Sequence, residues 1–318
     1  MPRFRNFEPT GVIPACLLPF HDDLSIDDAA YKRHIAQVAA TQGISAITVN
    51  AHASEVASCS FEEQAKVLDL TMEEVGDKLP VVHGVYADGS LEATRIARMA
   101  AIGGASALLV FPPNPFTMGQ RPEMAIAHVS RIAEATDLPI VLFQYPLAGG
   151  QGYPVDTLLR LISAVPQIRA IKDWCNNVPQ HETQIRLLQA LSRPVRVLST
   201  HSAWLMSSLV LGCDGLLSGM GSVAADLQVA LFQAVREGSL PRAQAINERL
   251  RPLTEVFYDA PAVDMHNRMK EALVALGRLP RAVVRPPLVK LSSDEIARIA
   301  RAVARAGLTT SGARLEAA

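Results

Sequence analysis

Short apolar runs alternate with helix-like segments along most of this chain. Three runs follow a helix-like stretch that ends at glycine, as in AQVAATQG–ISAITVN, ARMAAIGG–ASALLVF and SSLVLG–CDGLLS. Glycine is favoured just past a helix C-terminus because it adopts positive φ without a steric cost. Four more runs follow a proline, which ends a helix and favours extended backbone: LPVVHGV, LPIVLFQ, VPQIRAIKD and RPVRVLS. The pattern therefore predicts a repeated strand–helix unit.

With VIPACLLP near the N-terminus, the apolar runs number about eight and begin near residues 12, 46, 81, 107, 140, 168, 195 and 215. Their spacing, mostly about 27 to 35 residues, is the length of a βα unit. Continuous apolar runs are typical of parallel strands that are covered on both faces. We therefore predict an α/β protein with a closed (β/α)8 TIM barrel. A doubly wound open sheet is the alternative, but no GxGxxG follows the first strand.

The sequence beyond the eighth strand reads as helices, among them VDMHNRMKEALVALG and SDEIARIARAVARAG. A barrel needs only one closing helix, so the others must lie outside it. We expect residues 1–224 to form the barrel with the catalytic site. Residues 225–318 are expected to form a C-terminal helical extension packed on the barrel, frayed from about Thr309.

Composition narrows the class of protein. Apolar residues make up 49% of the chain and the formal net charge is −1, so neither a nucleic-acid footprint nor an acidic tail is indicated. The apolar runs are too short for a membrane span, and the N-terminus lacks the pattern of a signal peptide. The four cysteines show no CxxC pair or metal-ligand spacing, which indicates reduced thiols. We expect a soluble, cytoplasmic protein.

Lys172 is the first candidate for chemistry. Active sites of barrels lie at the C-terminal ends of the strands, and of six lysines only Lys172 ends an apolar strand, IRAIK. Desolvation there lowers the pKa of an ammonium group, and a neutral amine is what attack on a carbonyl carbon requires. A structural lysine that pairs with a carboxylate at the barrel mouth is the alternative.

Tyr145 and His52 are candidates for proton transfer. Tyr145 lies two residues after Phe143 in VLFQYP, so both side chains face the same side of the strand. His52 follows the second strand in NAHASE, and its ordinary pKa suits proton transfer near neutrality. Either residue could instead be only hydrogen-bonded, and His201 is a weaker candidate. No metal site is expected, because His52, His83 and His201 come from different strands without a supporting carboxylate cluster.

At these residues the chain resembles the dihydrodipicolinate synthase / N-acetylneuraminate lyase family of class I, Schiff-base aldolases. The resemblance runs from about Gly11 to Pro287. It rests on GVIPACLLPF, ASEVASCSFEEQAKVL, PIVLFQYP, AIKDW, GCDGLLSGMGSVAADL and MKEALVALG with VRPPL. It implies a barrel with a helical extension, usually a homotetramer, and it implies that Lys172 is the Schiff-base lysine. No metal or other cofactor is expected, because the lysine imine is itself the electron sink.

Several positions depart from the family pattern. Gly-Thr-Thr-Gly-Glu is replaced by Ala51-His52-Ala53-Ser54-Glu55, and the family tyrosine position holds Phe143. Tyr145 lies an even number of residues away and could take over the hydroxyl. The arginine that dihydrodipicolinate synthases use matches Ala148, and their loop tyrosine after the fourth strand is missing from FPPNPF. We therefore expect a substrate other than that of the lysine pathway.

These observations predict a lyase that forms a Schiff base between Lys172 and pyruvate or another 2-oxo acid, with an aldehyde as a candidate second substrate. Tyr145 and His52 are assigned to proton transfer. The predicted substrate-binding residues are Ala53, Ser54, Phe143, Ser218 and Gly219. The reaction is a C–C cleavage, a condensation or a dehydration. The alternatives are a dihydrodipicolinate synthase of lysine biosynthesis and a non-catalytic relative that binds a 2-oxo acid.

Overall fold

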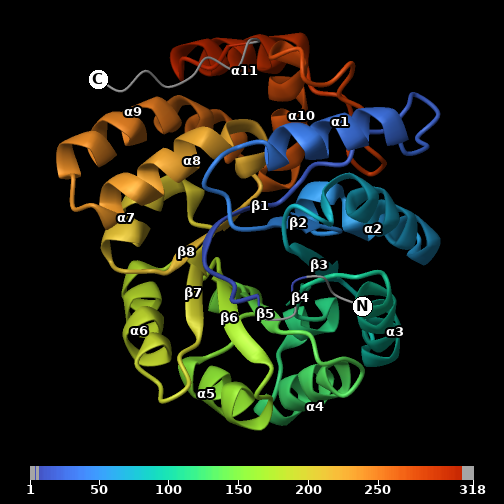
Figure 1. Ribbon diagram of the computed structural model, residues 1–318, viewed down its shortest axis with the longest axis vertical. Helices are drawn as coiled ribbons and strands as arrows, with labels where there is room; N and C mark the ends of the chain where they lie inside the picture. Colours follow the sequence, from blue (N-terminus) through green and yellow to red (C-terminus); the bar gives the residue numbers. More distant parts are fainter. Residues whose placement is uncertain (1–3, 5–6, 310–318) are drawn as a thin grey trace.

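The computed structural model describes residue 4 and residues 7–309, and within them eight parallel strands form a barrel ringed by helices (Figure 1). The strands are β1 (Gly11–Pro14), β2 (Ile47–Val49), β3 (Val81–Val85), β4 (Ala107–Val110), β5 (Ile140–Gln144), β6 (Ile168–Asp173), β7 (Arg196–Ser199) and β8 (Gly215–Ser218). Each begins within one residue of its predicted start. The predicted TIM barrel is confirmed, and the open doubly wound sheet is excluded.

Hydrogen bonds close the ring between its first two strands. The order around the sheet is β1-β8-β7-β6-β5-β4-β3-β2, so a gap would remain between β1 and β2. Ser45 N donates to Val12 O over 2.9 Å, and Cys16 N donates to Thr48 O over 2.8 Å. Because the ring is closed, none of the eight strands within residues 7–309 has an unpaired edge, and their C-terminal ends face one mouth.

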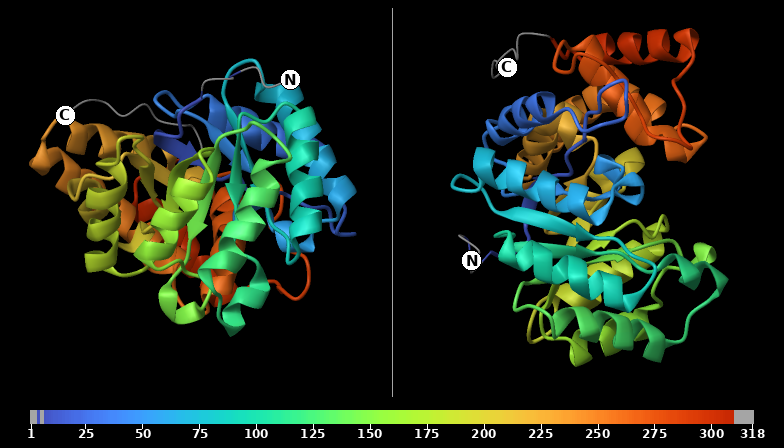
Figure 2. Two further views of the ribbon diagram at one scale, coloured as in Figure 1. Left: turned by 90° about the horizontal axis from the view of Figure 1, so that it is seen from below. Right: turned by 90° about the vertical axis from the view of Figure 1, so that its right-hand side faces the viewer.

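The helices follow the strands as the sequence predicts. They are α1 (Asp28–Ala39), α2 (Phe61–Val75), α3 (Ser90–Ile102), α4 (Pro122–Ala133), α5 (Val155–Ala164), α6 (Val178–Gln189), α7 (Leu205–Val210) and α8 (Gly221–Arg236). Short 3₁₀ turns lie at the strand ends: η1 (His52–Ser54), η2 (Val56–Ser58), η3 (Asn114–Met118), η4 (Leu147–Gly149) and η5 (Ser202–Trp204). Figure 2 shows the outer helices standing alongside the strands.

Local sequence signals explain where helices begin and end. Before α2, Ser60 Oγ accepts from Glu63 N, and the Glu63 carboxylate accepts from Ser60 N, so a capping box satisfies two backbone donors. The glycines expected after helices, Gly43, Gly104 and Gly212, all have positive φ, at 90°, 95° and 102°.

The C-terminal extension consists of α9 (Leu240–Phe257), η6 (Ala262–Asp264), α10 (Met265–Ala275) and α11 (Ser293–Arg305). Helix α8 packs on β1 and runs across the predicted boundary at residue 224, where Ala224 interrupts the helical backbone. Helix α9 packs on α8, and α11 packs on α9 and α10 (Figure 1). The division into 1–224 and 225–318 stays a prediction, and its frayed end lies outside the described residues from 310 on.

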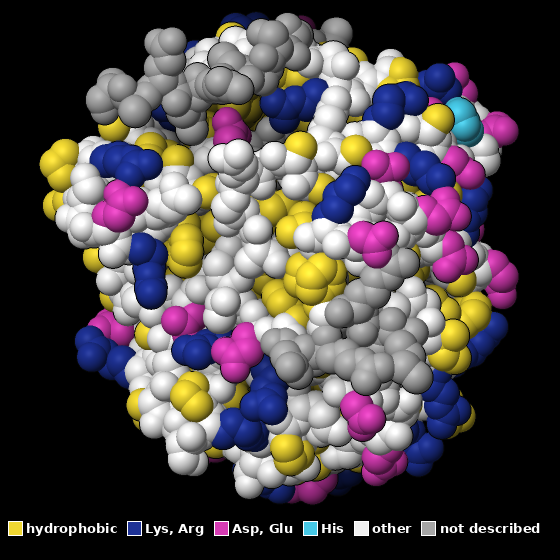
Figure 3. Space-filling model, viewed as in Figure 1, with side chains coloured by type: hydrophobic (Ala, Val, Ile, Leu, Met, Phe, Trp, Pro, Cys, Tyr) yellow, Lys and Arg dark blue, Asp and Glu magenta, His cyan; other side chains and the backbone are white. Residues whose placement is uncertain are grey.

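The surface carries charges of both signs. On the face shown in Figure 3, acidic and basic side chains lie interspersed around apolar patches. Within the described part of the chain, no helix is long and apolar enough to span a membrane.

The close approach of β3 to the end of β2 gives a stability prediction. A Cβ added at Gly84 would lie 1.8 Å from the backbone oxygen of Asn50, which the closed ring holds in place. We expect Gly84→Ala to destabilise the fold by about 3 kcal/mol or more, measured as a fall in the urea unfolding midpoint. Gly89→Ala is the control, because a Cβ there meets nothing within 4 Å. Equal midpoints for the two variants would contradict this account.

Candidate active site

Lys172 lies in the penultimate position of β6, opposite Phe143 of β5 in the sheet register. The side chain is buried, with 5% of the residue exposed, and Nζ lies 4.1 Å from the centre of the Phe143 ring. Burial lowers the pKa of Lys172 to about 7, because an ammonium group loses its hydration among apolar neighbours. A large fraction of this amine is therefore neutral at physiological pH.

The structure brings His52 and Tyr145 together. His52 Nε2 lies 3.0 Å from the Tyr145 hydroxyl, and the Tyr145 ring lies 4.6 Å from that of Phe143, centre to centre. Burial, and then the charge of Lys172, lower the pKa of His52 to about 3, so the imidazole is neutral at pH 7. Burial raises the pKa of Tyr145 well above its ordinary value, so the phenol keeps its proton. A neutral imidazole facing a protonated phenol forms a hydrogen-bonded pair able to pass a proton.

A small cavity of about 40 Å³ lies at Lys172, and we call it the inner cavity. Its lining includes five of the residues selected from the sequence, namely His52, Ala53, Phe143, Lys172 and Gly219. Tyr145 does not line this cavity, but its hydroxyl lies within hydrogen-bond distance of His52, which does.

Two predicted substrate-binding residues lie outside the lining of the inner cavity. The Ser54 hydroxyl donates to Cys16 O over 2.9 Å, and the Ser218 hydroxyl lies 3.1 Å from that of Ser202. Both hydroxyls are thus bonded within the protein, and their assigned contact with substrate stays a prediction.

His266 is one of the cavity-lining residues that the sequence did not indicate. It lies on α10 of the extension and lines the inner cavity beside Gly219, where an added Cβ would come within 3.0 Å of His266 Nε2. Burial, and then the neighbouring His52 and Lys172, hold the pKa of His266 well below its ordinary value. No local signal in VDMHNRMK marks it, because only the packing of the extension brings α10 to the barrel mouth.

A buried ion pair ties the extension to the loop after β2. Lys270 of α10 pairs with the carboxylate of Glu55, and both side chains are almost fully buried. The second carboxylate oxygen of Glu55 accepts from Arg285 N over 3.0 Å. Glu55 is the residue of the family loop pattern that this chain retains. The pair holds Glu55 in place, and with it the adjoining turn that carries His52 and Ala53.

A second buried group offers metal-ligand atoms on the other side of β6. Asp173, Cys175, His181 and His201 bring one ligand atom each to within 4.8 Å of one another. His181 Nδ1 lies 2.7 Å from Asp173 Oδ2, and Cys175 N donates to Asp173 Oδ1. Burial raises the pKa of Asp173, but the hydrogen bonds with His181 and His201 outweigh it and keep that pKa below its ordinary value. These contacts make the four residues a hydrogen-bonded network around the Asp173 carboxylate. The sequence analysis considered His201 without Asp173 and therefore did not predict this network.

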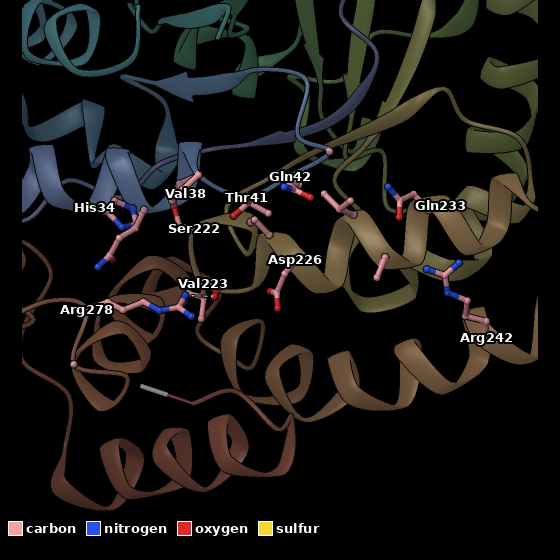
Figure 4. A pocket seen from close by; sticks show the side chains of 18 residues that line it. His34, Val38, Thr41, Gln42, Ser222, Val223, Asp226, Gln233, Arg242 and Arg278 are labelled. Atoms are coloured by element: carbon pink, nitrogen blue, oxygen red, sulfur yellow. Dashed lines mark hydrogen bonds between the residues drawn. The ribbon is translucent and has the colours of Figure 1, made fainter. Parts of the chain in front are cut away.

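A larger cavity of about 690 Å³ lies between α1 and α8, away from Lys172. Figure 4 shows His34 and Val38 of α1 across from Asp226 of α8, with Arg278 at one end. None of the residues selected from the sequence lines it.

The Glu55–Lys270 pair gives a prediction about stability. Glu55→Gln leaves the Lys270 ammonium buried without an anion, which we expect to cost about 3 to 5 kcal/mol in the free energy of unfolding. The double variant Glu55→Gln/Lys270→Met removes both charges and should recover most of this loss. Urea unfolding of the three proteins measures both effects. A single variant as stable as the parent would show that the pair contributes nothing.

Comparison with known proteins identifies the family of this chain. The family model of the dihydrodipicolinate synthetase family matches residues 8–306. The chain is 30% identical over 290 residues to a 4-hydroxy-tetrahydrodipicolinate synthase of Methanothrix thermoacetophila, covering 91% of this chain and 94% of that protein. It is 24% identical to a probable 2-dehydro-3-deoxy-D-pentonate aldolase of Escherichia coli, over 90% and 93% of the two chains.

Solved structures show the same fold. A prophage protein of E. coli K12, belonging to the dihydrodipicolinic acid synthase family and solved in complex with pyruvate, superposes with a TM-score of 0.87 at 23% identity, covering 94% of this chain and 99% of the other. A monomeric dihydrodipicolinate synthase variant superposes with a TM-score of 0.86 at 24% identity, over 96% and 98% of the two chains. The family match over nearly the whole chain, together with the barrel and its helical extension, shows that this protein belongs to the dihydrodipicolinate synthetase family.

Proposed function

We propose that this protein is a lyase in which Lys172 forms a Schiff base with pyruvate or another 2-oxo acid. The observation that carries the proposal is a buried amine, with its pKa lowered to about 7, that lines a cavity beside a histidine–tyrosine pair. An ordinary lysine is almost entirely protonated at pH 7 and is a poor nucleophile. In Lys172, burial alone keeps much of the amine neutral, so no neighbouring base is needed to remove its proton.

The reaction begins when the neutral Lys172 amine attacks the C2 carbonyl. The carbinolamine loses water and gives a protonated imine, which withdraws electrons from C3. Loss of a proton from C3, or cleavage of the C3–C4 bond in a longer substrate, gives an enamine. In this mechanism His52, at the cavity wall, exchanges the proton with substrate, and the Tyr145 hydroxyl behind it relays that proton. No metal or other cofactor is required by these steps.

The turn after β2 is the proposed binding site of the 2-oxo-acid carboxylate. Ser54 N and Glu55 N already donate within the turn, to Ala51 O and His52 O, both over 2.9 Å. We therefore assign the carboxylate to the Ala53 side of the turn, which lines the inner cavity. Gly219 and Phe143 complete the walls, while Ser54 and Ser218 hold the strand ends beneath.

The second substrate is proposed to differ from that of a dihydrodipicolinate synthase. Ala148 lies exposed in η4 and offers no guanidinium for a substrate carboxylate. The alternative, synthesis of 4-hydroxy-tetrahydrodipicolinate, is favoured by the name of the relative that is 30% identical. A homotetramer is proposed from the family resemblance alone.

Trapping tests the Schiff base. Reduction with cyanoborohydride in the presence of pyruvate should attach one pyruvyl group to Lys172, identified by peptide mass spectrometry. The rate should rise about tenfold per pH unit below pH 7 and level off above it, because the amine must be neutral and its pKa is about 7. Lys172→Met is the control and should give no adduct. An adduct at another lysine, or none, would refute the mechanism.

Exchange of the pyruvate methyl protons for deuterium, followed by NMR, tests the proton relay without a second substrate. Tyr145→Phe and His52→Ala should each slow exchange by about a hundredfold to ten-thousandfold. Because the two residues act as one relay, the double variant should be little slower than the slower single variant. Trapping of pyruvate at Lys172 should persist in Tyr145→Phe. If Tyr145→Phe exchanges at the parental rate, the hydroxyl has no part in proton transfer.

A further inference from the structure

The inner cavity opens toward a second, larger space. This outer cavity measures about 450 Å³ and shares His52, Trp174, Met265 and His266 with the inner cavity. The inner cavity, at about 40 Å³, holds little more than a few atoms. A substrate joined to Lys172 through C2 must therefore extend past His52 and His266 into the outer cavity.

The wall of the outer cavity is largely apolar. Val56, Val263, Pro286 and Leu288 line it, and the Tyr86 and Trp174 rings add aromatic surface. Val263 is 64% exposed, so an apolar side chain stands open to solvent at this site. An apolar wall beside a reactive group favours a ligand that buries apolar surface of its own.

The charged groups of this wall, Glu55 and Arg285, are already bonded to protein. Glu55 is paired with Lys270 and accepts from Arg285 N. The Arg285 guanidinium pairs with Glu63 and donates to the carbonyl oxygens of Leu24 and Ser58.

The hydroxyl groups of Ser58 and Tyr86 each have one protein partner. Ser58 Oγ donates to Glu55 O over 2.8 Å, and Asn114 donates to the Tyr86 hydroxyl over 3.0 Å. Among the described residues of the wall, Arg285 is the one full cation, and it has a carboxylate partner. A substrate carboxylate would therefore find no free cation among these described residues to offset the hydration that it loses, and a polyhydroxylated chain would meet a mostly apolar wall.

We propose that the second substrate is an uncharged aldehyde bearing an aromatic ring, which occupies the outer cavity between Tyr86 and Trp174. This inference rests on the proposed Schiff-base function. The volume suits it, because an apolar cavity of about 150 Å³ is enough to bind benzene. Aromatic neighbours favour an aromatic ligand through offset or edge-to-face contacts.

The reaction balances without an oxidant or reductant. The pyruvyl enamine on Lys172 attacks the aldehyde carbon through C3, the new C3–C4 bond forms, and the aldehyde oxygen takes a proton. Water then hydrolyses the imine, frees the lysine and releases a 4-aryl-4-hydroxy-2-oxobutanoate. Run in reverse, the same steps cleave that acid to pyruvate and the aromatic aldehyde.

The test compares aldehydes with pyruvate as the common partner. The parental enzyme is assayed with benzaldehyde, 4-carboxybenzaldehyde, glyceraldehyde and aspartate semialdehyde. We expect kcat/KM for benzaldehyde to exceed each of the other three by at least tenfold. A polyhydroxylated or carboxylated aldehyde that equals or exceeds benzaldehyde would overturn the inference.

A matched pair of variants tests whether the aldehyde binds in the outer cavity. Val263 and Val289 are both exposed, at 64% and 71%, so a carboxylate at either position is compatible with folding, but only Val263 lines the outer cavity. Val263→Asp should lower kcat/KM for benzaldehyde at least tenfold relative to Val289→Asp. Equal values would place the aldehyde elsewhere and overturn the inference. Trapping of pyruvate at Lys172 needs no aldehyde. If the parental enzyme forms no pyruvyl adduct, the proposed Schiff-base function itself is wrong, whichever aldehyde is used.

Discussion

Closure of the strand ring is the constraint on which the site depends. The hydrogen bonds that join β1 to β2 remove the last free edge, and the ring then holds the ends of all strands around one mouth. This register sets Lys172 opposite Phe143 and brings the turn after β2 to the same opening. Residues far apart in the chain become neighbours because the ring admits one arrangement.

Desolvation is the physical effect that sets the protonation states of these neighbours. The apolar surroundings that make the ammonium form of Lys172 unfavourable also keep His52 and His266 neutral. The same surroundings continue into the outer cavity, where Glu55 is paired with Lys270 and Arg285 with Glu63. One apolar environment thus lowers the pKa of Lys172, and under the proposed function it would also favour uncharged ligands.

The helical extension takes part in the site as well as covering the barrel. Helix α10 contributes His266 to the cavity and Lys270 to the buried pair with Glu55, which fixes the loop that carries His52. The retained glutamate of an otherwise altered loop thus has a structural explanation. Changes in the packing of the extension should therefore reach the site through this pair.

The sequence by itself determined the barrel, the positions of its strands and the special place of Lys172. Those features depend on local signals. Proline and glycine mark the boundaries of elements, and an apolar run that ends in lysine can be recognised in the amino-acid sequence. It also placed Tyr145 and Phe143 on one side, because side chains alternate along a strand. The tertiary structure alone decided that Tyr145 faces His52, that His266 enters the cavity and that Glu55 pairs with Lys270. These contacts join residues from distant elements, and their distances follow from ring closure and helix packing, which no local pattern encodes.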